Sequence, residues 1–286
     1  MFSYRHAFHA GNHADVLKHI TLLETLRYLL LKDTALQIVD THAGGGLYAM
    51  GGDFAQKSME ADGGINKLWE QTDLPQPVED YLQAIHAYNP NGLLKIYPGS
   101  PALIWNLLRP QDKLDLFELH PNEQRVLQSN VRQLDMSHQI KVHVADGFKG
   151  LRALLPPPSR RGLVLMDPSY EMKNNYHLVQ DCISEALQRF ATGVYIVWYP
   201  VIALPQSHQL AGKLKKLTQN AGKKWLNATL KVRNPQKDLF GLIESGVFVI
   251  NPPFVLQEKL KQSLPYLAKQ LSQGKGAGYE LEASSS

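Results

Sequence analysis

The chain has 286 residues, of which 44% are hydrophobic and 20% are charged, so it can bury a full core and is too apolar for a disordered protein. Its single cysteine, Cys182, excludes a disulfide framework and a cysteine-based zinc cluster. The net charge is +4, no apolar run reaches the ~18–20 residues that span a bilayer, and the polar N-terminus lacks the apolar core of a signal peptide, so we expect a soluble, cytoplasmic protein.

Short apolar runs alternate with helical patterns along the chain. Strands are predicted at Leu36–Asp40, Leu114–Glu118, Lys141–Asp146, Leu163–Asp167, Tyr195–Tyr199 and Val247–Ile250. Helices are predicted at Asp15–Lys32, Pro121–Leu134, Asn175–Phe190 and His208–Asn220. Several strands are continuously apolar, as expected when helices cover both faces of a sheet. The alternation therefore predicts an α/β fold with a mostly parallel sheet.

An acidic segment interrupts this alternation. Gly51–Leu93 holds seven acidic and two basic residues, shows helical patterning and has little strand character. We expect residues 51–93 to form a small helical subdomain inserted into a main domain of residues 1–50 and 94–262, rather than ordinary crossover helices, which need far fewer residues. Residues 274–286 are predicted to be a flexible tail.

A basic run lies near the C-terminal end. His208–Lys237 contains eight Lys and Arg residues and no acidic residue. A polyanion such as nucleic acid suits this run, because each neutralised phosphate releases counterions. A solvated lysine-rich helix face explains the same pattern equally well.

Four successive predicted strands end in an acidic residue. Asp40 leads into a turn that contains Gly44, and Glu118, Asp146-Gly147 and Asp167 end the strands that follow. Because parallel strands carry their ligands at the carboxyl edge of the sheet, these residues are expected to meet there. Glu118 is placed to accept hydrogen bonds from a ribose diol, so the pattern predicts a nucleoside site.

The glycine-rich turn alone does not identify the ligand. Gly44–Ala49 also matches the dinucleotide fingerprint G-x-G-x-x-A, so a nicotinamide or flavin oxidoreductase remains an alternative. The turn lacks the Gly-Lys-Ser/Thr ending of a P-loop, which disfavours a nucleoside triphosphatase.

The segment Asp167-Pro168-Ser169-Tyr170 separates these alternatives. The N6 amine of adenine is a poor nucleophile, and an enzyme that methylates it must accept hydrogen bonds from its protons. Asp167 offers a carboxylate and Pro168 a backbone carbonyl for this purpose, while Tyr170 is predicted to stack on a flipped base. The segment resembles the Asp/Asn-Pro-Pro-aromatic motif of amino-methyltransferases, with Ser169 in place of the second proline.

A second segment matches the residue types of that motif more closely. Asn251-Pro252-Pro253-Phe254 also follows an apolar strand, but it comes some 200 residues after the glycine turn and after six strand candidates. In the usual order of a class I methyltransferase the catalytic loop follows the fourth strand, so we expect Asn251–Phe254 to lie far from the methyl donor.

Several motifs together resemble the bacterial 23S ribosomal RNA adenine-N6 methyltransferases. They are Tyr4–His19, Asp40–Gly44, Tyr97–Pro101, Glu118–Pro121 and Asp167-Pro168. The resemblance implies a class I S-adenosylmethionine-dependent methyltransferase with a Rossmann-like, seven-stranded, mostly parallel sheet and a small helical insertion. It also implies a monomer that acts on protein-free 23S ribosomal RNA and uses S-adenosylmethionine as its cofactor.

The resemblance also implies roles for individual residues. The residues implied to contact S-adenosylmethionine are Lys18, His19, His42, Ser100, Glu118, Asp146, Gly147 and Asp167. Asp40 and Gly44 join this set through the glycine-rich turn. Tyr4 would contact the RNA, and we expect the adjacent Arg5 and His6 to do the same.

Other functions remain open at this stage. A DNA adenine methyltransferase and a DNA-binding protein involved in the use of external DNA are the alternatives, although the short acidic insertion is a poor candidate for wrapping a duplex. The spacing of His6, His9 and His13 could hold a metal on a helix, but no acidic residue precedes Asp15, and we expect no metal.

Overall fold

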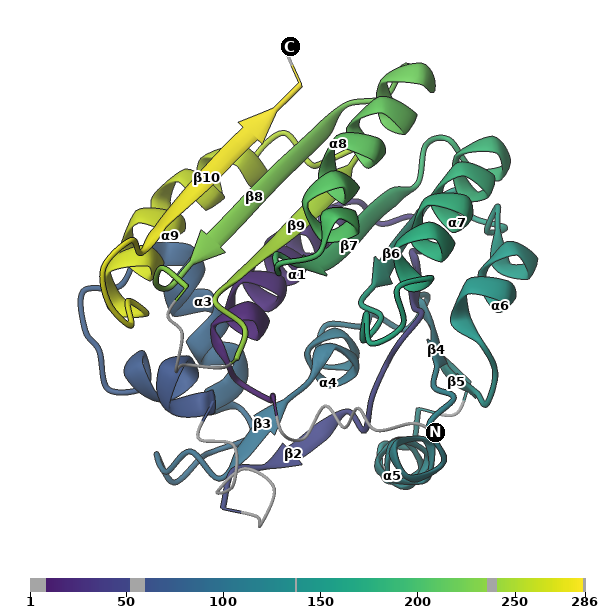
Figure 1. Ribbon diagram of the computed structural model, residues 1–286. Helices are drawn as coiled ribbons and strands as arrows, with labels where there is room; N and C mark the ends of the chain where they lie inside the picture. Colours follow the sequence, from purple (N-terminus) through teal and green to yellow (C-terminus); the bar gives the residue numbers. More distant parts are fainter. Residues whose placement is uncertain (1–8, 52–59, 137, 236–240, 285–286) are drawn as a thin grey trace.

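The computed structural model describes residues 9–51, 60–136, 138–235 and 241–284. They form an eight-stranded sheet with helices on both faces (Figure 1). From one edge to the other the strands are β10 (Gly278–Ala283), β8 (Trp225–Lys231), β9 (Glu244–Ile250), β7 (Val194–Pro200), β6 (Gly162–Met166), β1 (Gln37–Asp40), β4 (Lys113–Phe117) and β5 (Ile140–His143). A separate ribbon pairs β2 (Leu47–Ala49) with β3 (Ile96–Pro98).

The expected α/β class with a mostly parallel sheet is confirmed. Strands β5, β4, β1, β6 and β7 are mutually parallel, whereas β9 runs antiparallel to both of its neighbours. The chain leaves β1 for β4 and β5 on one side and returns to β6 on the other side. The loops after β1 and β6 therefore diverge, and the crevice between them is where open α/β sheets bind ligands.

Two groups of helices cover the sheet. The helices on one face are α1 (His13–Leu30), α3 (Gln76–His86), α4 (Ser100–Trp105), α5 (Pro121–Arg132) and α9 (Leu256–Gln270). Those on the other face are α6 (Gly147–Leu154), α7 (Asn175–Arg189) and α8 (Pro205–Asn220). All five residues of β6 are buried, as its continuous apolar sequence predicts for a strand covered on both faces. Across these described ranges, no helix has the length and apolar character needed to traverse a bilayer.

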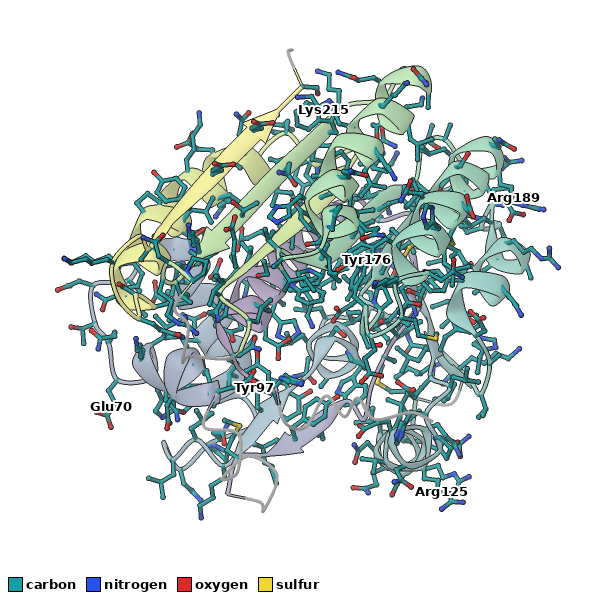
Figure 2. All side chains as sticks on the ribbon, in the orientation of Figure 1. Glu70, Tyr97, Arg125, Tyr176, Arg189 and Lys215 are labelled. Atoms are coloured by element: carbon teal, nitrogen blue, oxygen red, sulfur yellow. The ribbon has the colours of Figure 1, made fainter. Side chains whose placement is uncertain are left out.

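The segment between β1 and β4 packs on the first helix. Its described elements include η2 (Glu60–Gly63), η3 (Ile65–Lys67) and α3, and α3 contacts both α1 and α9. Ile65 and Tyr81 are fully buried in the same apolar cluster as Leu17 of α1. Figure 2 shows Tyr97 of β3 within this region, and its hydroxyl lies 3.0 Å from that of Tyr81. The segment thus shares the core of the main domain.

The structure corrects the expectation for the C-terminal tail and for the strand number. Residues 278–283, expected to be flexible, form β10 and pair antiparallel with β8 from Gly278 opposite Lys231 to Ala283 opposite Leu226. The sheet therefore has eight strands instead of seven. Without β10 the backbone of β8 would be an unpaired sheet edge, which is a liability for a folded protein.

The basic run divides between α8 and β8. Lys215 lies 4.4 Å above the Trp225 ring and 3.6 Å from the Glu282 carboxylate. Figure 2 shows it at the margin of the molecule, away from β2 and β3. The Lys215 ammonium therefore already has an aromatic and a carboxylate partner within the fold.

The segment Asn251–Phe254 follows β9. Because β9 is antiparallel to β7, Asn251 lies at the edge of the sheet opposite to Asp40 and Asp167. Its backbone has φ +52°, and its side-chain amide donates to the carbonyls of Ala191 and Gly193 at 3.0 and 2.7 Å. The amide thus fixes a loop, and the segment lies far from the other predicted site residues.

We predict that Asn251→Ala lowers the free energy of unfolding by about 1–3 kcal/mol, because two backbone carbonyls lose their donor and alanine tolerates positive φ less well than asparagine. Equilibrium unfolding in urea measures the change. Asn174→Ala is the control, since that exposed side chain makes no capping hydrogen bond, and its effect should stay within about 0.5 kcal/mol. Equal effects in the two variants would contradict the structural role of Asn251.

Candidate active site

A cavity of about 390 Å³ opens at the carboxyl edge of the parallel strands. Its walls are formed where four parallel strands end. Residues 41–44 follow β1, residues 117–120 lie at the end of β4, residues 145–148 follow β5, and residues 167–172, except 170, follow β6. Residues that are more than a hundred positions apart in the sequence thus line one crevice at the predicted edge of the sheet. This follows from the parallel register, which aligns Asp40 of β1 with Leu116 of β4 and Leu165 of β6.

Most of the predicted site residues line this cavity. Those that do are Lys18, His42, Gly44, Ser100, Glu118, Asp146, Gly147, Asp167 and Pro168. Three others, His19, Asp40 and Tyr170, are not in its walls. Tyr4, Arg5 and His6 lie outside the described residues.

Glu118 is held in place by the backbone. One carboxylate oxygen accepts from the amide of Gly44 at 2.8 Å, and the other accepts from the amide of His120 at 2.6 Å. Burial raises the pKa of Glu118 above its usual value, although these two amides act in the opposite direction. Each oxygen keeps a further lone pair, so the fixed carboxylate can accept hydrogen bonds from a pair of hydroxyls in the cavity.

Gly147 permits a close approach between two of these segments. A Cβ at this position would lie 2.0 Å from the carbonyl oxygen of Thr41, so no side chain fits without moving the backbone. The preceding Asp146 caps α6, accepting from the amides of Phe148 and Lys149 at 2.9 and 3.4 Å. The turns after β1 and β5 therefore meet in the wall of the cavity.

Asp40 supports the site from behind. Its side chain is fully buried and accepts from the Ser100 hydroxyl at 2.6 Å and from the His42 amide at 3.2 Å. Burial raises the pKa of Asp40 to about 6. The carboxylate thus holds two residues that line the cavity, and a direct contact of Asp40 with the ligand stays a prediction.

His42 enters the cavity as a neutral ring. Burial lowers the pKa of its imidazole to about 4. Its Nδ1 lies 2.8 Å from the hydroxyl of Thr41, which itself donates to the carbonyl of Leu165 at 3.0 Å. The Thr41 oxygen therefore accepts from Nδ1–H, and the tautomer leaves Nε2 as a hydrogen-bond acceptor.

Asp167 forms an ion pair with the first helix. The Nζ of Lys18 lies 2.5 Å from Oδ2 of Asp167 and 2.7 Å from Oδ1 of Asp15. The lysine side chain is only 3% exposed. Burial alone would lower the pKa of Lys18, but the two carboxylates raise it above its usual range, so the ammonium stays charged.

Tyr170 occupies a different place from the one predicted. Its ring is 4% exposed, its hydroxyl donates to the carbonyl of Trp198 at 2.8 Å, and it packs 4.7 Å from the Tyr176 ring. The backbone at Tyr170 has φ +54°, which turns the side chain into the core beneath the cavity. In this structure the ring therefore packs in the core, and the stacking role of Tyr170 stays a prediction.

His19 is also behind the cavity. It is fully buried, and its Nδ1 lies 2.8 Å from the hydroxyl of Tyr97. Lys18 and His19 are adjacent and project about 100° apart on α1, so they lie in different surroundings, and the contact of His19 with the cofactor stays a prediction. Only Lys18 of the pair points into the cavity.

Apolar side chains of the cavity were missed by the sequence analysis. They include Phe117, Leu119, Phe148 and Met172, of which Leu119 and Met172 are 45% and 64% exposed. Each lies within a few residues of a predicted acidic strand end, so the neighbours of those acids were the available signal. Such exposed apolar groups at a cavity suit the flat faces of bases.

The charge of the cavity restricts its ligand. Five carboxylates occur among the described lining residues, those of Glu118, Glu123, Asp146, Asp167 and Glu171, against the single ammonium of Lys18. This balance favours a cationic ligand and opposes a pyrophosphate, which disfavours the dinucleotide alternative. In the parts of the chain that the structure describes, no group of three or more His, Cys, Asp or Glu residues is arranged to hold a metal ion.

Comparison with known proteins identifies relatives that span almost the whole chain. The sequence family described as "Ribosomal RNA large subunit methyltransferase D, RlmJ" matches residues 33–282. Two proteins named "Ribosomal RNA large subunit methyltransferase J" are similar to this chain. The Escherichia coli (strain K12) protein is 43% identical over 271 residues, and the Haemophilus influenzae protein is 44% identical over 272 residues. Each alignment covers 95% of this chain and 94% of the relative.

A solved structure has the same fold. The crystal structure of a Legionella pneumophila protein superposes with a TM-score of 0.85 and 38% sequence identity. The superposition covers 97% of this chain and 99% of that protein.

The raised pKa of Asp40 predicts a pH-dependent stability. The folded pKa of about 6 exceeds the ordinary value of 3.8, so the stabilising contribution is complete below about pH 4 and is lost as pH rises through 6. Relative to Asp40→Asn, the wild-type free energy of unfolding should fall by about 3 kcal/mol between pH 4 and pH 7.5. Urea unfolding at several pH values measures it, and parallel curves for the two proteins would refute the shift.

Proposed function

The chain belongs to the family of ribosomal RNA large subunit methyltransferases, and on this premise we propose that its cavity methylates the N6 amine of an adenine in 23S ribosomal RNA. The protein is an S-adenosylmethionine-dependent ribosomal RNA methyltransferase. We propose the N6 nitrogen as the methylated atom, 23S RNA as the substrate, and a role for each residue of the cavity. The observation that carries it is the Asp167-Pro168 turn, which lines the cavity at the end of β6.

The donor groups of the cavity fit S-adenosylmethionine. When bound, this cofactor supplies a methyl group on a positively charged sulfonium, and the acidic cavity complements that charge. Glu118, fixed by two amides, would accept hydrogen bonds from the ribose hydroxyls. Asp146, Gly147 and the acceptor nitrogen of His42 would hold the remaining polar groups.

The adenine amine would be oriented by two acceptors on one turn. Lys18 binds Oδ2 of Asp167, so we assign Oδ1 to one N6 proton and the carbonyl of Pro168 to the other. Two accepted hydrogen bonds draw the nitrogen away from conjugation with the ring and direct its lone pair towards the methyl group. This is stabilisation by fixed acceptors, with orientation as the second contribution.

Ser169 takes the place of the second proline of the motif. It lines the cavity between Pro168 and the buried Tyr170. The hydrogen bond from Tyr170 to Trp198 and its packing on Tyr176 anchor the end of the turn. These contacts supply rigidity that a proline would otherwise contribute, so both proposed acceptors keep their positions.

The proposal extends to the RNA partner. We propose that the enzyme acts as a cytoplasmic monomer on protein-free 23S RNA, with Tyr4, Arg5 and His6 at the RNA. Residues 51–93 are proposed to act as a subdomain that braces the first helix. The contacts of α3 with that helix, and the burial of Ile65 of η3 in its apolar cluster, support this assignment. A DNA substrate, or a role in the use of external DNA, is not favoured, because both named relatives are ribosomal RNA methyltransferases.

The substrate prediction is tested with radiolabelled S-adenosylmethionine. We expect label in N6-methyladenosine when the enzyme is incubated with protein-free 23S RNA that lacks the modification, and none with DNA or with assembled subunits. Nucleoside analysis after digestion identifies the base and the position. Label in DNA, or at another nitrogen of adenine, would contradict the proposal.

The catalytic prediction concerns Asp167. We expect Asp167→Asn to lower kcat by about 10²- to 10³-fold, because the neutral amide is a weaker acceptor for an amine that gains positive charge. Calorimetry should still show binding of S-adenosylhomocysteine and no binding of NAD. Asp181→Asn, an exposed carboxylate on α7, is the control and should retain full activity. Full activity of Asp167→Asn would refute the mechanism.

A further inference from the structure

Asp15 is a buried carboxylate with no role in the mechanism so far. It lies in the first turn of α1, and its side chain is 4% exposed. It does not line the cavity. Burying a charge is costly unless it is paired, so the partners of this carboxylate show what it does.

Those partners connect three parts of the protein. Oδ1 lies 2.7 Å from Nζ of Lys18 and 3.9 Å from Nε2 of His19, and Oδ2 accepts from the backbone amide of Gly11 at 2.9 Å. The same Lys18 ammonium lies 2.5 Å from Oδ2 of Asp167. The Lys18 ammonium therefore bridges Asp15 and Asp167, the proposed acceptor of the adenine amine.

The arrangement of charges explains why the Asp15 carboxylate lies beside Lys18 in addition to that of Asp167. If Lys18 faced Asp167 alone, the buried pair would be neutral, and the ammonium would draw electron density from the carboxylate that must accept the amine. With Asp15 also bound, the ammonium is shared between two carboxylates. The cation is also held from two sides, which fixes the position of Oδ2 of Asp167.

The other oxygen of Asp15 connects this cluster to the N-terminal segment. Gly11 has φ +79°, and its carbonyl accepts from the amide of Ile65 at 2.8 Å. A Cβ on Gly64 would lie 2.0 Å from that carbonyl, so the two backbones are in close contact. The entry to α1, the insertion and the catalytic turn therefore share one buried polar network through Asp15.

We propose that Asp15 is a positioning residue, which holds the Lys18 ammonium between two carboxylates and thereby keeps Asp167 oriented towards the substrate amine. The inference rests on the proposed function for its consequence in catalysis. The coupling between Asp15 and Lys18 is a property of the folded chain and can be measured without a substrate. A purely structural role is the rival, since an acidic residue in the first turn also stabilises a helix.

The kinetic test uses Asp15→Asn, which keeps the shape and removes the charge. We expect kcat for ribosomal RNA methylation to fall by about 10- to 100-fold. The Kd for S-adenosylhomocysteine should stay within about threefold. In a Lys18→Met background the same replacement should change kcat by less than about twofold, because its effect passes through the lysine. Independent losses in the two backgrounds would overturn the proposal.

The matched control is Glu24→Gln. Glu24 lies on the same helix, is 4% exposed and pairs with Lys259 at 3.4 Å, away from the cavity. Its replacement should lower the urea midpoint while leaving kcat unchanged. If Glu24→Gln lowered kcat as much as Asp15→Asn does, the effect would be one of helix stability, and the positioning role would be refuted.

Urea unfolding of the cofactor-free protein gives a second readout. Asp15→Asn should lower the midpoint in the wild-type background. It should raise the midpoint in the Lys18→Met background, because one of two buried carboxylates without a cation is removed. A lower midpoint in both backgrounds would overturn the coupling. Absence of methylation by the wild-type enzyme would instead refute the proposed function, and the unfolding cycle would still decide the coupling.

Discussion

An ammonium group that is almost completely excluded from water connects the first helix to the centre of the sheet. Lys18 is 3% exposed and lies within 2.7 Å of carboxylates on α1 and after β6. Such a charge is tolerated only when its partners are fixed, so the pairing constrains how α1 docks, where the turn after β6 runs and which oxygen of Asp167 is bound by Lys18. The start of α1 is also fixed by the Asn12 cap and by the hydrogen bond from Ile65 of η3 to Gly11.

The remainder of the cavity is organised by hydrogen bonds behind its surface. Asp40 holds Ser100 and the backbone of His42, Thr41 sets the tautomer of His42, and two amides fix Glu118. These supports mean that the groups facing a ligand are oriented before it binds, which reduces the entropy lost on binding. The surplus of carboxylates then favours a cationic nucleoside over a dinucleotide with two phosphates.

Sequence reasoning succeeded where local pattern and global topology agree. The six predicted strands correspond to β1, β4, β5, β6, β7 and β9, and the acidic ends of the first four converge as expected. The sequence patterns did not reveal β8, because Asn227 and the flanking lysines obscure its alternation of apolar and polar residues. They did not reveal β10 either, because this segment is a strand only through its pairing with β8, some 50 residues earlier. The burial of Tyr170 was not foreseen, because the positive φ at this residue, which directs its side chain into the core, has no signal in the sequence.

The sequence by itself determined the alternating fold, the edge of the sheet that holds the site and the preference for Asp167 over Asn251, because strand order and strand-end residues are local properties. Only the tertiary structure decided which polar residues line the cavity and which lie behind it. Asp40 and Ser100 are both polar and adjacent to glycine turns, yet one is fully buried behind the other. The proposed role of Asp15 likewise depends on its distances to Lys18 and Gly11 in the folded protein. The effect of a buried charge is set by the partners that packing places around it, and these partners cannot be read from the sequence.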